Sequence, residues 1–206
     1  WNKADIGTKK KKKIFVFDEV WSFLTDIGGK LIEDMYRTFR KKGASVWTLS
    51  QSIKDFANSK YAAGIMDNVS FSYVLKQSDN TNFDLLKKTL NLSNANLQQI
   101  KQLQQKKGYY SDVFLNVANH PSYVARLVPS PWEYWLATTS STDLGILNPV
   151  YKHFDKDLID TIDFLARNCP KGYFTFEKDY DKKLKDFNGN TVKTLKHLSQ
   201  KYRNVS

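Results

Sequence analysis

The chain has 206 residues, a formal net charge of +11 and 41% hydrophobic residues. This length and apolar content are sufficient for a folded core, and a single domain is the starting expectation. No apolar run approaches the roughly 18 residues of a membrane-spanning helix. The single cysteine, Cys169, excludes an internal disulfide and a cysteine-cluster metal site. The positive charge favours nucleic acid, anionic lipid or acidic proteins as partners.

The first thirteen residues form a polar lead-in that ends in five lysines, Lys9 to Lys13. Such a run is typically solvated, and contact with phosphates, lipid headgroups or a neighbouring subunit is the alternative. The chain starts at Trp1 and shows no charged-then-apolar leader, so we expect a piece cut from a longer protein.

The most informative stretch is Ile14 to Trp21, with the sequence IFVFDEVW. Four consecutive apolar residues predict a strand buried on both faces, and two acids follow at its carboxyl end, where open α/β sheets bind ligands. This is the Walker B pattern of nucleoside triphosphatases, in which Asp18 would hold Mg²⁺ and Glu19 would act as general base. The alternative is a strand followed by a helix, whose dipole favours acids at its start.

A strand–helix–strand unit is expected around these acids. Leu31, Ile32, Met35, Tyr36 and Phe39 form one helical stripe, Gly43 ends the helix, and Ala44 to Leu49 is a second short apolar run. The second strand would deliver Gln51 to the same sheet edge as Glu19, where an amide could bind the attacking water or the γ-phosphate. The alternative is that Gln51 caps a helix at residues 53–56.

The remainder of the chain predicts mostly short elements. Arg126 lies in the second arm of an expected β-hairpin, where it either faces solvent or reaches a phosphate. Residues 130–133 have the spacing of a capping box. The expected elements are helices at residues 61–68, 82–90, 94–103, 132–136, 158–168 and 191–202, a strand at 71–75, hairpin arms at 109–117 and 123–128, and an extended stretch at 137–141.

A complete nucleotide site also needs a glycine-rich phosphate loop, G-x-x-x-x-G-K-[ST], and this sequence contains none. Gly28 to Leu31 (GGKL) lacks the required glycine and hydroxyl and follows the acidic strand instead of preceding it. We therefore expect the second half of a nucleotide site, with the phosphate loop upstream. The three histidines are too widely spaced to predict a zinc site.

Several segments resemble the conjugative-transfer and type IV secretion ATPases of the TraC class, the VirB-type secretion ATPases. They are residues 14–21 (IFVFDEVW), 36–43 (YRTFRKKG), 46–56 (VWTLSQSIKDF), 122–127 (SYVARL) and 130–139 (SPWEYWLATT). The resemblance covers residues 14–143, and residues beyond about 150 carry no matching motif.

This resemblance implies a RecA-like ATPase on the cytoplasmic face of a bacterial inner membrane. Its ligands would be ATP and Mg²⁺, and it would assemble as a hexamer and with other secretion-channel proteins, with DNA as a further candidate partner. By position, Asp18 and Glu19 would be the Walker B pair and Gln51 the sensor glutamine. Arg37, Arg40 and Arg126 would contact phosphates or a neighbouring subunit.

The predicted fold is therefore α/β: the second half of a parallel RecA-like P-loop NTPase sheet, with a β-hairpin and a C-terminal helical tail. The predicted domains are a basic lead-in (1–13), the ATPase portion (14–147) and a helical appendage (148–206). Two other functions remain open. One is a DNA-pumping coupling protein of the same superfamily, which the net charge suits, and the other is a non-catalytic interaction module.

Overall fold

The structure is a computed structural model, which describes residues 12–78 and 80–203. Most of the predicted basic lead-in therefore lies outside the described residues. The chain divides into two compact units. The first unit holds the described residues up to Leu103 together with Asp112–Ala125, and the second holds Gln104–Ser111 and the described residues from Arg126 onward.

The first unit contains the predicted strand–helix–strand motif. Strand β1 (Lys13–Phe17) pairs in parallel with β2 (Ala44–Thr48), and α1 (Asp26–Thr38) connects them. A short 3-10 helix follows α1, and Gly43 then turns the chain into β2 with a φ of +69°, a conformation that glycine adopts without a steric penalty. The mixed α/β fold with a parallel sheet is thus confirmed.

The expectation that β1 is buried on both faces is wrong. Phe15 packs edge-on against Phe39 at 5.1 Å between ring centroids, which places one face of the strand against the segment that follows α1. On the other face, Ile14 is 65% exposed and Val16 is 58% exposed. Both faces of β1 carry apolar side chains, which explains its uninterrupted apolar sequence. Only one of these faces is covered by described residues.

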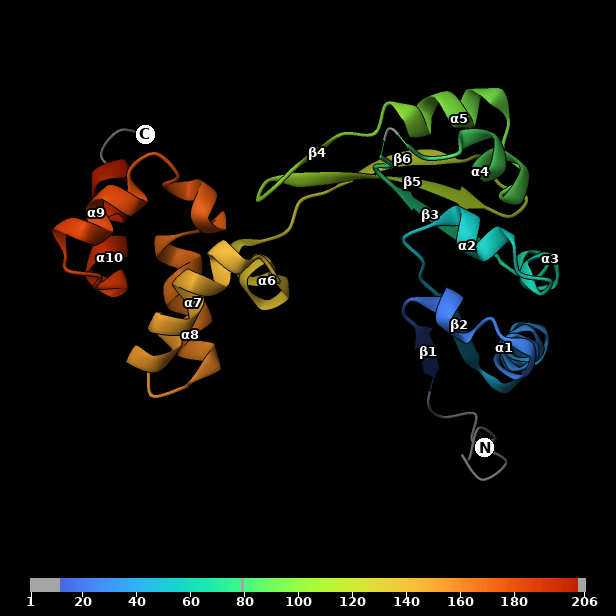
Figure 1. The fold of residues 1–206 in the computed structure, drawn as a ribbon, viewed down its shortest axis with the longest axis horizontal. Helices are drawn as coiled ribbons and strands as arrows, with labels where there is room; N and C mark the ends of the chain where they lie inside the picture. The colour runs from blue at the N-terminus through green and yellow to red at the C-terminus, as the bar shows by residue number, and fades with distance from the viewer. Residues whose placement is uncertain (1–11, 79, 204–206) are drawn as a thin grey trace. The chain divides into compact units, whose positions relative to one another are not determined.

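A second, antiparallel sheet is built around the predicted hairpin. Strand β5 (Tyr110–Val117) pairs with β6 (Tyr123–Leu127), with β3 (Phe71–Leu75) and with the very short β4 (Gln105–Lys106). Figure 1 shows α4 (Phe83–Thr89) and α5 (Asn94–Lys101) beside this sheet. Their buried side chains form a core with those of the sheet, namely Val74, Leu86, Ile100, Leu103 and Phe114.

Two of the short helices begin after a polar side chain that caps them. The Asn82 side chain accepts a hydrogen bond from Leu85 N at 3.0 Å, and Ser93 accepts one from Asn96 N at 3.1 Å, so each occupies an N-cap position. The remaining helices of the first unit are α2 (Ile53–Ala57) and α3 (Ala62–Met66).

The second unit is mainly helical. The predicted capping box is present at the start of α6, where the Ser130 hydroxyl accepts from Glu133 N and the Glu133 carboxylate accepts from Ser130 N. The helices of this unit are α6 (Pro131–Ala137), α7 (Ser141–His153), α8 (Leu158–Asn168), α9 (Tyr180–Asp186) and α10 (Thr191–Arg203).

Helix α7 was not predicted, because Pro149 lies within it and proline disfavours a helix interior. The helix persists because Ile146 and Val150, on either side of Pro149, are fully buried in the core of the second unit. Helix α7 also runs through the predicted boundary between residues 147 and 148. The domain bounds given by the sequence stay a prediction.

Candidate functional site

The carboxyl ends of β1 and β2 lie side by side, and backbone hydrogen bonds continue their pairing into the loops. Leu49 N donates to Phe17 O, and Val20 N donates to Leu49 O, both at 2.9 Å. The segment containing Asp18 and Glu19 is therefore held next to the segment that leads to Gln51. This is the sheet edge at which the sequence predicts a ligand site.

Glu19 is the centre of the polar contacts at this edge. Its carboxylate accepts one hydrogen bond from Trp21 Nε1 at 2.7 Å and another from the Gln51 side-chain amide. Glu19 is partly buried, whereas Gln51 is exposed and Trp21 is 50% exposed. The predicted meeting of Gln51 and Glu19, which are 32 residues apart in the chain, is thus present in the structure.

The backbone at Glu19 has an unusual conformation. Its φ and ψ angles are 50° and 49°, which is the left-handed helical region that non-glycine residues seldom occupy. The Ser22 hydroxyl donates to Glu19 O at 2.9 Å and closes the turn after the strand. Such conformations recur at functional sites, where the surrounding structure holds them in place.

Asp18, the predicted magnesium ligand, directly follows β1. It is exposed, and its Oδ1 accepts a hydrogen bond from Glu19 N at 3.0 Å. Within the ranges 12–78 and 80–203, no group of three or more His, Cys, Asp and Glu side chains could hold a metal ion. Mg²⁺ usually binds through one or two carboxylates together with substrate phosphates and water. The Asp18 carboxylate therefore fits a metal whose other ligands come from a nucleotide.

Two further residues support the site from α1 and β2. Tyr36 OH and Thr48 Oγ1 lie 3.0 Å apart, and burial raises the pKa of the Tyr36 hydroxyl. This contact joins the helix to the last residue of β2. Sequence reasoning missed it, and it also missed Trp21 as a partner of Glu19. The only signal for Trp21 was its place two residues after that glutamate.

Of the arginines predicted as site residues, the two in the first unit lie away from Glu19. Arg37 lies in the last turn of α1 and pairs with Glu33 at 2.7 Å, and Arg40 lies in the 3-10 helix just before β2. The register pairs Lys13 with Ala44, so this part of the chain is at the opposite end of the two strands from Glu19. A five-residue strand is about 16 Å long, which exceeds the reach of an arginine side chain.

Arg126 belongs to the second unit. It lies in β6 as predicted, and its guanidinium is stacked 3.8 Å from the centroid of the Tyr110 ring. This is a cation–π contact, an interaction that arginine makes more often than lysine does.

The glycine pair at the start of α1 has a packing function. Gly28 and Gly29 lie in the first turns of the helix, and a side chain at Gly29 would overlap the ring of Tyr61. The Tyr61 hydroxyl donates to Asp26 O at 2.6 Å, which fixes the ring against the helix. Close packing therefore accounts for Gly29 without a phosphate ligand.

None of the helices within residues 12–78 and 80–203 is both long enough and apolar enough to cross a bilayer.

Comparisons with known proteins identify the family of this chain. The family model for the TraG P-loop domain matches residues 6–168, a span that contains Asp18, Glu19, Gln51 and Arg126 and ends at the end of α8. It therefore extends beyond residues 14–143, over which motifs were recognised. A search of curated protein sequences returned no significant match.

Among solved structures, the chain is similar to VirB4 of Thermoanaerobacter pseudethanolicus, with 21% sequence identity and a TM-score of 0.49. The match covers 60% of this chain and 33% of that one, so the chain spans about a third of the length of this relative. Because the family model covers well over half of the residues, the chain belongs to the TraG P-loop domain family.

Proposed function

We propose that this chain is the C-terminal portion of a type IV secretion or conjugation motor ATPase, which hydrolyses ATP to drive DNA or protein transfer or pilus assembly. The observation that carries the proposal is the contact of Gln51 with Glu19 at the carboxyl ends of two parallel strands. Membership of the TraG P-loop domain family supports the same assignment.

In the proposed mechanism, Glu19 is the general base that accepts a proton from the attacking water. The Trp21 and Gln51 donors hold its carboxylate at the strand end. When water and nucleotide are present, the Gln51 amide is placed to bind either the water or the γ-phosphate, which makes it a sensor of hydrolysis. Asp18 would hold Mg²⁺, which neutralises charge on the β- and γ-phosphates when it is bound.

The chain itself has no glycine-rich phosphate loop, so the proposal places that loop upstream in the parent protein. Arg37 and Arg40 lie at the end of the strands away from Glu19, which favours an interchain role for them. An arginine supplied by a neighbouring subunit can accelerate phosphoryl transfer by roughly 10³–10⁵. The proposed assembly is a hexamer, which rests on the resemblance of the sequence motifs to secretion ATPases.

The proposed location is the cytoplasmic face of a bacterial inner membrane, in contact with other proteins of the secretion channel. This part of the proposal rests on the family resemblance of the sequence motifs. It is tested by fractionation of the parent protein with and without its channel partners.

The decisive experiment measures ATP turnover by the parent protein with Glu19→Gln. The amide keeps the shape of the side chain but cannot accept the proton, so turnover should fall by about 10²–10⁴, the usual contribution of a general base. Binding of ATP, measured by calorimetry, should persist.

A matched control is Glu177→Gln, which removes the same charge from an exposed position in the second unit. It should leave turnover unchanged. Full activity of Glu19→Gln, or an equal loss in both variants, would remove Glu19 as the base and would favour the non-catalytic interaction module.

A further inference from the structure

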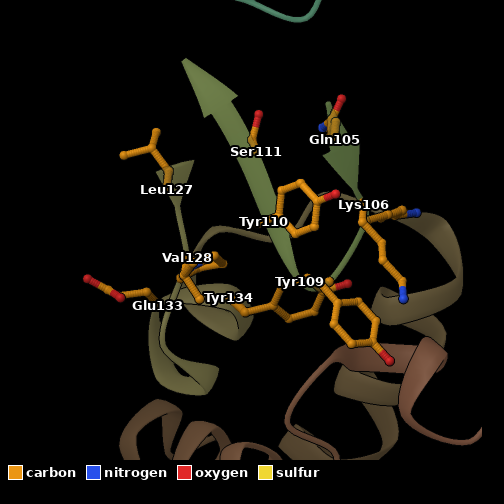
Figure 2. Close-up of a pocket in the computed structure, with 12 residues that line it drawn as sticks. Gln105, Lys106, Tyr109, Tyr110, Ser111, Leu127, Val128, Glu133 and Tyr134 are labelled. Atoms are coloured by element: carbon orange, nitrogen blue, oxygen red, sulfur yellow. The ribbon is translucent and has the colours of Figure 1, made fainter. Parts of the chain in front are cut away.

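A hollow in the second unit combines cationic, aromatic and apolar side chains and has no part in the proposed ATPase chemistry. It has a volume of about 520 Å³, within the usual range for small-ligand sites. Figure 2 shows Leu127 and Val128 on one side of it, Lys106 and Tyr109 on the other, and Tyr110 between them.

Two lysines flank the Tyr109 ring, and a third, Lys107, lines the hollow. The ammonium groups of Lys106 and Lys171 lie 4.1 Å and 3.9 Å from the centroid of the Tyr109 ring. Lys107 lines the hollow and donates to Ser140 Oγ at 3.0 Å. In the part of the chain that the structure describes, none of these lysines is paired with a carboxylate.

Gly108 allows the lysines to come together. It has a φ of +76°, and a Cβ on it would lie only 2.9 Å from Lys171 O. A larger residue would push the turn that carries Lys106 and Lys107 away from Lys171. Positions more than sixty residues apart in the chain thus place Lys106 and Lys171 on the same tyrosine ring.

One acid lies on the rim of the hollow. Glu133 closes the capping box of α6, and hydrogen bonds from Ser130 lower the pKa of its carboxyl, which favours the ionised form. The net charge around the hollow remains positive, and the repulsion from Glu133 directs an anion toward the lysine side.

The opposite wall of the hollow is apolar and open to solvent. Leu127 is 54% exposed and Val128 is 69% exposed, and Pro129 continues this wall. A ligand that is anionic at one end and flat and apolar at the other would satisfy both walls. Nucleotides have this character, and proteins that bind single strands combine cationic side chains with apolar and aromatic ones.

We propose that this hollow binds a nucleotide unit, with the phosphate on Lys106 and Lys107, the nearby Lys171 adding to their positive charge, and the base against Leu127 and Val128. A second hollow of about 380 Å³ shares Lys107, Pro129, Glu133 and Tyr134 with the first. This adjoining space gives room for the next unit of a strand. The ligand is either a free nucleotide or a unit of a single-stranded nucleic acid.

The test is the fluorescence anisotropy of a labelled short oligothymidylate with the full 206-residue chain. EDTA is included so that magnesium-dependent binding at Asp18 does not contribute. The site variant is Lys106→Gln/Lys107→Gln/Lys171→Gln, and the control is Lys182→Gln/Lys185→Gln/Lys193→Gln, which removes the same charge from exposed positions in the same unit.

We expect the site variant to lose at least about tenfold in affinity, and its dependence of log K on log salt to be shallower by about 0.7, since the hollow holds one phosphate and each contacted phosphate of a single strand contributes about 0.7. The control should bind as the unchanged chain does. Competition by thymidine monophosphate would identify a free nucleotide as sufficient, and competition only by longer strands would identify nucleic acid.

Three results would overturn the proposal: no binding by the unchanged chain, equal losses in the site and control variants, or competition by polyglutamate as strong as that of the oligonucleotide. The last result would identify an acidic peptide as the partner. Circular dichroism checks the fold of each variant, and single lysine substitutions replace the triple variant if it fails to fold.

Discussion

Two carboxylates, one in each unit, organise hydrogen bonds in very different ways. Asp143 in α7 is completely buried and accepts three hydrogen bonds, from Tyr134 OH at 2.7 Å, Thr138 Oγ1 at 3.0 Å and Tyr173 N at 2.8 Å. Glu19 is partly exposed, has a left-handed backbone, and accepts from the exposed side chains of Trp21 and Gln51.

The difference shows what each carboxylate is suited to do. The donors to Asp143 come from α6, from the loop after it and from the turn that contains Tyr173, so this acid fastens three segments of the second unit together. A buried acid of this kind stabilises the fold only while every partner is present. The donors to Glu19 can exchange with solvent, which leaves its carboxylate available to water.

The largest expected effect is a difference in the stability lost when Asp143 or Glu19 is replaced. Asp143→Ala should lower the free energy of unfolding by about 3–5 kcal/mol, because three partly buried donors lose their shared acceptor. Glu19→Ala should change it by less than about 1 kcal/mol, because water can replace its partners. Urea denaturation of the 206-residue chain measures both. Similar losses in the two variants would erase the proposed distinction.

A second prediction concerns the effect of alkaline pH on the buried core of the second unit. Burial raises the pKa of the Cys169 thiol to about 12, and Trp135 Nε1 donates to Cys169 O at 2.8 Å in the same core. The folded chain therefore keeps this proton when the unfolded chain has lost it. The stabilising effect is complete below the unfolded pKa of about 9 and is lost as pH rises toward 12.

Between these two pH values the thiol should reduce stability by about 1.4 kcal/mol per pH unit. Urea denaturation of the unchanged chain and of Cys169→Ser at several pH values isolates this contribution, because the tyrosines titrate in both. Parallel pH profiles for the two chains would contradict the prediction.

The smallest expected effect concerns Trp21, an exposed donor to Glu19. Trp21→Phe keeps an aromatic ring but removes the indole donor to Glu19, so turnover by the parent protein should fall about tenfold, the equivalent of one lost hydrogen bond to a charged group. Urea stability should stay nearly unchanged.

The matched control for that substitution is Trp47→Phe. Trp47 is similarly exposed, at 45%, and its indole donates to Ser45 Oγ at 3.1 Å on β2, not to Glu19. Its turnover should match that of the unchanged protein. Equal losses in the two tryptophan variants would show that Trp21 has no special part in positioning Glu19.

The site could be predicted to the extent that it follows from strand geometry. The spacing of Glu19 and Gln51 fits one strand–helix–strand unit, and such a unit brings both residues to the same edge. Their catalytic roles remain a proposal. The hydrogen bond from Trp21 to Glu19 was not predicted. It depends on the left-handed backbone at Glu19, which no sequence pattern indicates.

The features that could not be predicted depend on distant packing. Asp143 draws its donors from residues as far apart as Tyr134 and Tyr173, and no local spacing connects them. Helix α7 contains Pro149, and the burial of neighbouring side chains offsets the destabilising effect of this proline on the helix. The apolar sequence of β1 indicates that both of its faces carry apolar side chains. It does not indicate which face the rest of the chain covers.

The left-handed conformation of Glu19 also matters for protein engineering. An L-residue other than glycine loses roughly 1–2 kcal/mol in this region of backbone space, so a glycine at this position would relax the turn. A thermostability design campaign would accept that replacement as an improvement and would delete the carboxylate at the same step. Any stabilised version of this chain should therefore be scored for turnover in the parent protein as well as for melting temperature.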